Sequence, residues 1–309
     1  MSQRHLGIGF ESTWNTAVAP TVFDGGVLRE AIRDEVNREE IRTIRNVSVD
    51  DWVLLNRVIR GDFESYMNYQ TIAYYLYLFY GVAPTTTLTG PYQHVFPPSG
   101  GLPATFREGV SATFEARRGA SNLNWRYSGS KVTGLSMTGG VDGVNKQTCS
   151  ILAANEARVA QAAASYADLD LMKPQDTTIN FDGSAVDFRR WAFNATFEVD
   201  EPLKGGSTRL AIEPQDLNLA VAGNVECYFA DTTEYDLFAN DSTVDLQIVC
   251  TDGTHSMTLN VNQVKLTQAT PPVEGRDRLI ATYEYAAKYD ADSTESFQAI
   301  IVDDNATIP

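Results

Sequence analysis

Apolar and polar residues alternate along much of the chain, most regularly in its second half. From Arg190 to Asp200, apolar side chains occupy every second position and mostly polar ones lie between them. A period of two over this length predicts a half-buried antiparallel strand with one polar face. Similar runs predict further strands at 207–212, 219–229, 243–250, 256–266, 278–289 and 296–302.

The first half carries comparable runs, separated by turn residues. The pairs Gly139-Gly140 and Asp142-Gly143 predict a tight turn between two of these runs. The predicted strands lie at 53–66, 93–96, 104–116, 125–138 and 144–152. The distribution of strand patterns along both halves therefore predicts a mainly β fold.

Helical signals are few. Residues 69–80 are apolar almost all round, which predicts a buried helix, and Gly81 follows where glycine commonly ends a helix. A shorter aromatic segment predicts a second helix near 231–239. The charged stretch 27–45 fits two interpretations: a surface helix with ion pairs four residues apart, or a strand that runs into a long loop.

Three segments lack a regular pattern. Residues 1–20 contain Gly7 and Gly9, end in Pro20, and predict an extended N-terminal arm. Residues 153–166 are rich in Ala and fit a short helix or, preferably, a segment that crosses between two halves. The C-terminal residues DDNATIP predict a frayed end or one that seeks a partner.

One short sequence occurs twice in similar surroundings. GDFESY runs from Gly61 to Tyr66, and GNVECY runs from Gly223 to Tyr228. Each copy follows an alternating stretch and precedes a segment with a helical pattern. The spacing is far too long for a solenoid, whose units are much shorter, so it favours one fold duplicated, with halves at 1–165 and 166–309. A chance match of six residues is the alternative.

Composition permits a folded protein with an acidic surface. The 309 residues are enough for one large domain or two ordinary ones, and 43% are hydrophobic. The net charge of -16 disfavours tight binding of nucleic acid, although DNA could still pass such a surface without adhering. A high-salt environment would also explain the acidic balance.

The sequence offers no recognisable catalytic or metal-binding set. Three widely spaced cysteines argue against a disulfide framework. His5, His94 and His255 lie far apart, and none has a partner at ligand spacing on an obvious scaffold. We therefore expect no enzyme activity, no metal site and no cofactor.

Two further features bear on where the protein is made. The N-terminus lacks the apolar core of a signal peptide. The longest apolar run, 72–82, is shorter than the roughly 20 residues that a membrane span needs. We expect a protein made in the host cytoplasm, without membrane insertion.

The order of several segments resembles the tail tube proteins of long-tailed phages and of related archaeal tailed viruses. The similar segments of the first half are GFESTWNTAVAP, the charged residues 29–45, RGDFESYMN, HVFPPSGGLPATFREGVSATFE and YSGSKVTGLSMTGGVDGVNKQTCSIL. Those of the second half are DFRRWAFNATFEVDEPL, AGNVECYFADTTEYDLFAND and LIATYEYAAKYD. The resemblance favours the strand-and-loop interpretation of the charged stretch.

The resemblance implies a fold and an assembly. Each half would be a β-sandwich or part-barrel with a short flanking helix, and its strands would join a β-barrel between subunits. The implied function is that of a structural virion protein whose rings stack into the tail tube, which conducts DNA from the capsid to the host. The resemblance implies that relatives with one tube fold per chain form rings of six subunits. Two copies of the fold in one chain therefore favour a ring trimer over a hexamer. Tail terminator, tape-measure and distal tail proteins are the implied partners, and the virion tail is the implied location.

Two sets of residues are candidates for this assembly. Acidic residues on alternating strands are candidates for lining the lumen: Asp62, Glu64, Glu198, Asp200 and Glu226. Their alternative roles are ion pairs or places on the outer surface. Candidates for contact between rings come from the arm and the charged stretch: Phe10, Trp14, Arg29, Glu39, Arg42 and Arg45.

Two other classes of protein share the acidic, β-rich composition. The first alternative is a carbohydrate-binding or adhesion β-sandwich module of a tail tip or surface layer. Such a module needs an exposed aromatic platform, whereas the aromatic residues here cluster in the helix and on alternating strand faces. The second is a hydrolase on a β-scaffold, which the missing acid and base residues disfavour.

Overall fold

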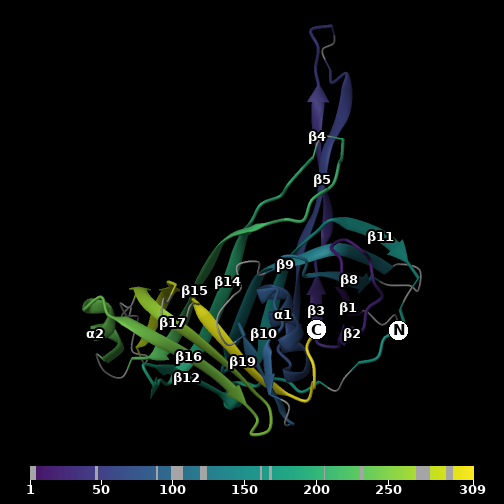
Figure 1. Cartoon of the computed structure of the whole chain (residues 1–309). Helices are drawn as coiled ribbons and strands as arrows, with labels where there is room; N and C mark the ends of the chain where they lie inside the picture. Colours follow the sequence, from purple (N-terminus) through teal and green to yellow (C-terminus); the bar gives the residue numbers. More distant parts are fainter. Residues whose placement is uncertain are drawn as a thin grey trace.

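The fold is mainly β and antiparallel, as the alternation predicts (Figure 1). The computed structural model describes residues 5–45, 48–87, 90–98, 107–118, 124–160, 162–166, 169–204, 206–229, 233–268, 279–289 and 295–309. The strands before residue 160 are β1 (Leu6–Glu11), β2 (Val22–Asp24), β3 (Val27–Glu30), β4 (Arg33–Ile41), β5 (Asp51–Tyr66), β6 (Thr85–Thr87), β7 (Tyr92–Phe96), β8 (Ser111–Arg117), β9 (Asn124–Gly140), β10 (Gly143–Ala153) and β11 (Asn155–Val159). The later strands are β12 (Thr177–Phe181), β13 (Ser184–Ala185), β14 (Phe188–Val199), β15 (Asp216–Tyr228), β16 (Thr243–Thr251), β17 (Ser256–Gln268), β18 (Ile280–Ala287) and β19 (Phe297–Asp303).

One continuous path of pairing runs through most of the molecule. Strands β3 and β4 both pair with β5, and the sheet continues through β10, β9, β14, β15, β18 and β17. From β17 the pairing divides, through β16 to β12 and β13, and through β19 to β7 and β6. A smaller sheet contains β2, β1, β8, β11 and the first part of β9. The long strand β9 therefore belongs to both sheets.

The helix α1 (Tyr69–Tyr80) lies in the core and confirms the predicted buried helix. Asn68 caps its start by accepting a hydrogen bond from the Gln70 N–H at 2.9 Å. Gly81 ends it in the left-handed region, at φ 62°, where glycine is favoured. Its surface contacts β9 on one side and β19 on the other, because nearly every side chain is apolar or aromatic. A second helix, α2 (Thr233–Ala239), lies at the left margin of the molecule in Figure 1, away from the central α1.

The two copies of the repeated sequence occupy comparable places. The first ends β5 and the second ends β15, and each strand is followed by a helix. Strand β5 pairs with β10, which forms a hairpin with β9; in the same way β15 pairs with β18, which pairs with β17. Phe63 and Val225 are both buried at the same point of the repeat. The two copies thus share their burial pattern and their pairing order.

The glycine that opens each copy lies where another backbone passes closely. A Cβ on Gly223 would come within 2.0 Å of the Ala192 carbonyl oxygen. A Cβ on Gly61 would come within 2.5 Å of the Ala31 carbonyl oxygen. Both positions need glycine because a side chain would force the neighbouring strand away. This shared requirement explains why glycine stands at both positions.

The structure corrects several predictions. The charged stretch forms β3 and β4, so the predicted long loop is wrong: Arg33–Ile41 pairs with β5 along a hairpin. The strand predicted at 207–212 is absent from those residues, which contribute only an isolated bridge from Leu210 to Leu203. Part of the predicted crossing segment is a strand, β11. In each case the presence or absence of a partner strand decides the local structure, and the local pattern does not contain that information.

Both ends of the chain are more integrated than the sequence predicts. Part of the expected N-terminal arm forms β1, which lies between β2 and β8. The C-terminal residues do not fray: Asp303 is fully buried, and the Asn305 side chain donates to the Gln70 carbonyl at 3.1 Å and accepts from the Tyr74 hydroxyl at 3.1 Å. These contacts fix the end of the chain against α1.

Candidate assembly surfaces

One face of the long sheet is covered by small, mostly uncharged residues. A row of register partners crosses it from strand to strand: Glu64, Thr148, Ser136, Asn194, Ala222 and Ala286. Each is exposed or half-buried, whereas its neighbours along the strand point into the core. We call this surface the polar sheet face; it comprises the outward residues of β5, β10, β9, β14, β15 and β18. Its middle is smooth because it carries Ser, Thr, Asn and Ala rather than long side chains.

The acidic candidates lie on or beside the polar sheet face. Asp62 and Glu64 are outward residues of β5, and Glu226 is an outward residue of β15. Glu198 is an exposed residue near the end of β14, on the same side as Asn194. Asp200 lies just beyond β14 and is exposed. The structure therefore places four of the five candidates on one face.

The acidic residues of β5 are paired with bases. Asp62 forms an ion pair with Arg29, a β3 residue. The Glu64 carboxylate lies 3.2 Å from the Lys146 ammonium and 3.9 Å from the Arg29 guanidinium. Such partly exposed pairs contribute little stability each. They do reduce the negative charge that this edge of the face presents to a molecule in front of it.

The long sheet ends in unpaired edges on both sides. Among the described residues, β3 and β4 pair only with β5, so their other edges have no partner. At the opposite end, β17 pairs with β16 as far as Lys265, while Leu266 and Gln268 pair only with β18. Unpaired backbone groups at a sheet edge are a template for adding another strand. The chain therefore presents an edge for pairing at either end of the polar sheet face.

The hairpin of β4 and β5 projects away from the rest of the molecule (Figure 1). Along its outer part every residue of β5 is exposed, including a run of large apolar side chains: Trp52, Val53, Leu54 and Leu55. Trp52 has 56% of its surface exposed. A lone two-stranded ribbon is only marginally stable in water, and apolar groups on both of its faces mark it as a contact surface.

The base of this hairpin is braced by the connection between β14 and β15. The Arg57 N–H donates to the Thr208 carbonyl at 2.7 Å. The Asp34 carboxylate contacts two guanidinium groups, those of Arg57 at 2.5 Å and Arg209 at 3.1 Å. Arg60 and Glu201 add another ion pair at 3.1 Å. The connection thus holds the start of the hairpin and leaves its outer part uncovered.

Comparison with protein families decides which class of protein carries these surfaces. The family model described as phage tail tube protein matches residues 1–287. The chain belongs to this family. It is a structural protein of the virion tail, and membership implies self-assembly together with other tail proteins. A comparison with curated proteins gives no significant match.

In this tail tube protein, the six candidate residues for contact between rings lie in different parts of the structure. Glu39, Arg42 and Arg45 lie toward the outer end of the projecting hairpin, where Arg42 pairs with Glu40 at 2.5 Å. Arg29 lies instead at the edge of the polar sheet face. The hairpin alone therefore brings three of the six candidates together.

The two aromatic candidates make contacts within their own chain. Phe10 packs against Tyr74 and Tyr77 of α1, with ring centroids 5.7 and 5.6 Å apart. Trp14 packs against the small cluster that contains Val58. We therefore do not carry these two residues into the assembly proposal.

Sequence reasoning missed most of the polar sheet face. Residues such as Ser136 and Thr148 are ordinary polar residues until the register shows that they form one row. A usable signal was present, because the alternation at 125–138 and 144–152 already separates inward from outward positions. The strand predicted at 53–66 likewise includes Val53, Leu54 and Leu55, whose consecutive apolar side chains break the alternation and are all exposed in the structure.

The three cysteines lie inside the protein. All three cysteines are buried, and none of them forms a disulfide. Burial raises the pKa of Cys250 to about 11 and that of Cys149 above its ordinary range, so both thiols stay protonated at neutral pH. Among the described residues, no helix is long and apolar enough to cross a membrane.

Proposed function

We propose that this tail tube protein polymerises as stacked rings into the tube that conducts viral DNA. In this arrangement the polar sheet face lines the lumen, the unpaired sheet edges join neighbouring subunits, and the projecting hairpin contacts the adjacent ring. The observation that carries the proposal is the long sheet with unpaired ends and one smooth polar face. Terminator, tape-measure and distal tail proteins would meet the tube at its ends and in its lumen.

The junction between β9 and β14 offers a template for the contact between subunits. These strands pair from Thr196 with Gly134 to Arg190 with Gly140, and they connect the first part of the sheet to the second. By the pairing order, β17 corresponds to β9. The hairpin of β4 and β5 corresponds to the hairpin of β14 and β15. The free edge of β17 at Leu266 and Gln268 would therefore pair with β3 and β4 of the next subunit. Such pairing closes the sheet into a barrel and leaves no open edge.

The repeated pairing order favours a ring of three subunits. Residues 1–165 and 166–309 would be two copies of one tube fold, each contributing a comparable set of strands to the barrel. Relatives with one tube fold per chain would fill the six positions of a ring with six chains. Three chains with two folds each would fill the same six positions, so the ring is a trimer with pseudo-sixfold symmetry. A hexamer of the whole chain would require a barrel twice as large from the same strands.

The chemistry of the polar sheet face suits a lumen through which DNA slides. Short hydroxyl, amide and methyl groups fill the middle of the face, where no long cation could hold a phosphate. The cations nearer its margin lie beside carboxylates, Lys146 with Glu64 at 3.2 Å and Arg190 with Asp142 at 3.4 Å. The acidic residues Glu198 and Glu226 add repulsion near the ends of their strands. A lumen of this kind would keep duplex DNA hydrated and moving because no tight contact forms.

The hairpin suits contact between rings. Its apolar side chains would be removed from water by the neighbouring ring, at roughly 25 cal/mol per Å2 of apolar surface buried. The contact joins two different surfaces, so it repeats without closing and builds a filament. A monomer or single ring would leave these side chains exposed.

Electron microscopy of the concentrated protein tests the proposal. We expect tubes whose end-on views show threefold rings around a pore wide enough for duplex DNA, with the polar sheet face inside. Sixfold rings of the whole chain would remove the trimer but keep the tube. Discrete particles without a pore, at low and high salt alike, would contradict the tube itself.

A further inference from the structure

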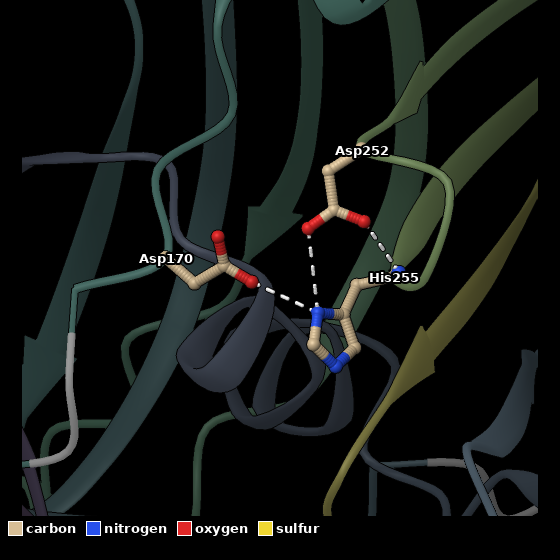
Figure 2. A group of neighbouring side chains, drawn as sticks. All are labelled: Asp170, Asp252 and His255. Atoms are coloured by element: carbon tan, nitrogen blue, oxygen red, sulfur yellow. Dashed lines mark hydrogen bonds and ion pairs between the residues drawn. The ribbon is translucent and has the colours of Figure 1, made fainter.

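His255 lies beside two carboxylates, that of Asp252 in its own turn and that of Asp170 from a distant segment (Figure 2). Its Nδ1 atom is 2.9 Å from the Asp170 Oδ2 atom and 3.5 Å from the Asp252 Oδ2 atom. The three ligand atoms all lie within 4.8 Å of one another. Ligands of one zinc ion at about 2.0–2.2 Å stand about 3–3.5 Å apart, so these atoms need only small shifts to share an ion.

The second nitrogen of the ring faces another carboxylate. His255 Nε2 lies 3.2 Å from the Asp304 Oδ2 atom. A histidine that binds a metal through one nitrogen commonly turns the other toward a carboxylate, which fixes the tautomer and orients the ring. This contact is separate from the group around Nδ1. With a cation on Nδ1, the ring proton would lie on Nε2 and face the Asp304 carboxylate.

The backbone holds these side chains in place. Asp252 lies in the turn between β16 and β17, and its Oδ1 atom accepts from the N–H groups of Thr254 and His255, each at 2.7 Å. Its Oδ2 atom is left to face the ring. The carbonyl of Asp170 accepts from the Tyr69 N–H at 3.1 Å, which ties this residue to the start of α1.

The fully buried Tyr69 lies on the protein side of His255 and the two carboxylates. Its ring lies beside the His255 ring, with centroids 6.0 Å apart. Its hydroxyl is buried and has no hydrogen-bond partner among the described residues. The front is open to ions, because Asp170 and Asp252 keep 33% and 28% of their side-chain surface exposed while His255 keeps 12%.

Charge favours a cation here. Asp170, Asp252 and Asp304 surround a single imidazole, and none of them pairs with a Lys or Arg among the described residues. Three carboxylates exceed the one positive charge that His255 could carry. A divalent ion would neutralise the excess.

We propose that His255, Asp170 and Asp252 form a binding site for a divalent transition-metal ion of the zinc type. Imidazole nitrogen with two carboxylate oxygens suits zinc better than calcium or magnesium, which prefer oxygen ligands alone. Water would complete the coordination. The ion would connect the segment that precedes β12, the turn between β16 and β17 and, through Asp304, the C-terminal end. This site does not depend on the proposed tube.

Zinc uptake by the full-length protein tests the site. A chelator first removes bound metal, and the protein is then dialysed against zinc. We expect one zinc ion per chain by elemental analysis, and a melting temperature that rises with zinc concentration. The variants His255→Gln and Asp252→Asn should each weaken zinc binding tenfold or more in calorimetric titrations. Asp182→Asn is the matched control, because Asp182 also accepts a backbone N–H, from Asp245 at 2.9 Å, but has no histidine beside it.

Two further measurements keep the proposal falsifiable if a variant folds poorly. In the parent protein, NMR of the three histidine rings should show only the His255 signals shifting on addition of zinc. Asp304→Asn, which leaves all three ligands in place, should retain binding with an affinity reduced by roughly 10- to 100-fold. The proposal fails if the protein takes up no zinc, if zinc shifts another histidine instead, or if His255→Gln binds zinc as tightly as the parent.

Discussion

Arg107 and Asp216 form a buried ion pair between segments 109 positions apart, with Arg107 Nε donating to Asp216 Oδ2 at 2.6 Å. The same guanidinium donates to the carbonyl oxygens of Phe79 and Val132 and lies over the Phe197 ring at 4.2 Å. Burial lowers the pKa of Arg107, and the Asp216 carboxylate opposes this shift. One side chain thus connects the end of α1, β9 and the β14–β15 hairpin.

Loss of one member of this pair should be costly. Arg107→Met leaves the Asp216 carboxylate buried without a cation, and we expect the free energy of unfolding to fall by about 3–5 kcal/mol. Urea denaturation measures the change. The double variant Arg107→Met with Asp216→Leu should lose clearly less than the sum of the two single variants, because it leaves no unpaired charge. Additive losses would contradict the coupling.

The glycine of the second repeat copy should resist substitution. Gly223→Ala places a Cβ against the Ala192 carbonyl oxygen, and we expect a loss of about 1–3 kcal/mol in unfolding free energy. Gly143→Ala is the control, because nothing lies within 4 Å of the Cβ built there. Equal stability of the two variants would show that β14 and β15 can separate without cost.

Acid should destabilise the protein partly through Glu115. Burial alone would raise the pKa of this carboxyl, but His5, the Ala162 N–H and the Arg126 guanidinium outweigh it and lower the pKa from its ordinary value of 4.5 to about 2. The folded-state pKa is the lower one, so the stabilisation is fully present above pH 4.5. It is lost as the pH falls from 4.5 toward 2, and amounts to about 3 kcal/mol.

The variant Glu115→Gln isolates this contribution. It should be less stable than the parent at pH 7, and its unfolding free energy should depend less on pH between 4.5 and 2.5. Glu108→Gln removes an exposed carboxyl and should follow the parent. The explanation fails if Glu115→Gln and the parent lose the same stability over this range.

The proposed ring contact should depend on Trp52. Trp52→Glu changes an exposed side chain, so we expect the isolated subunit to keep its fold and its melting temperature within a few degrees. Tube assembly should require at least tenfold more protein, measured by sedimentation and electron microscopy. Tyr235→Glu changes another exposed aromatic residue, at α2, and should leave assembly intact. Assembly of Trp52→Glu at the parent's concentration would remove the hairpin from the contact.

The proposed lumen should hold DNA once it carries cations. Tubes of the parent should not bind a short duplex, whereas tubes with Ser136→Lys and Asn194→Lys should bind it with an affinity that falls steeply as salt rises. Fluorescence anisotropy measures the binding. The control variant Thr87→Lys with Ser184→Lys adds the same charge on β6 and β13. If tubes of both double variants bind the duplex with similar affinity, the polar sheet face does not line the lumen.

Much of the fold could be predicted from local pattern. The strict alternation at 190–200 corresponds to β14, whose buried residues include Trp191 and Phe193. The apolar segment 69–80 corresponds to α1 because a helix with apolar residues on all sides must lie in the core. The charged stretch could not be predicted in this way, since its strand β4 has mostly exposed side chains and exists only through its pairing with β5.

The sequence by itself determined the mainly β class, the position of the buried helix, the repeated GDFESY and GNVECY segments and the resemblance to tail tube proteins. These properties depend on local periodicity and on the order of segments along the chain. Only the tertiary structure decided that Glu64, Thr148, Ser136 and Asn194 form one row, and that Asp170, Asp252 and Asp304 meet around His255. The physical reason is that strand register and turn geometry bring distant residues together, and no local pattern specifies which distant residues will meet.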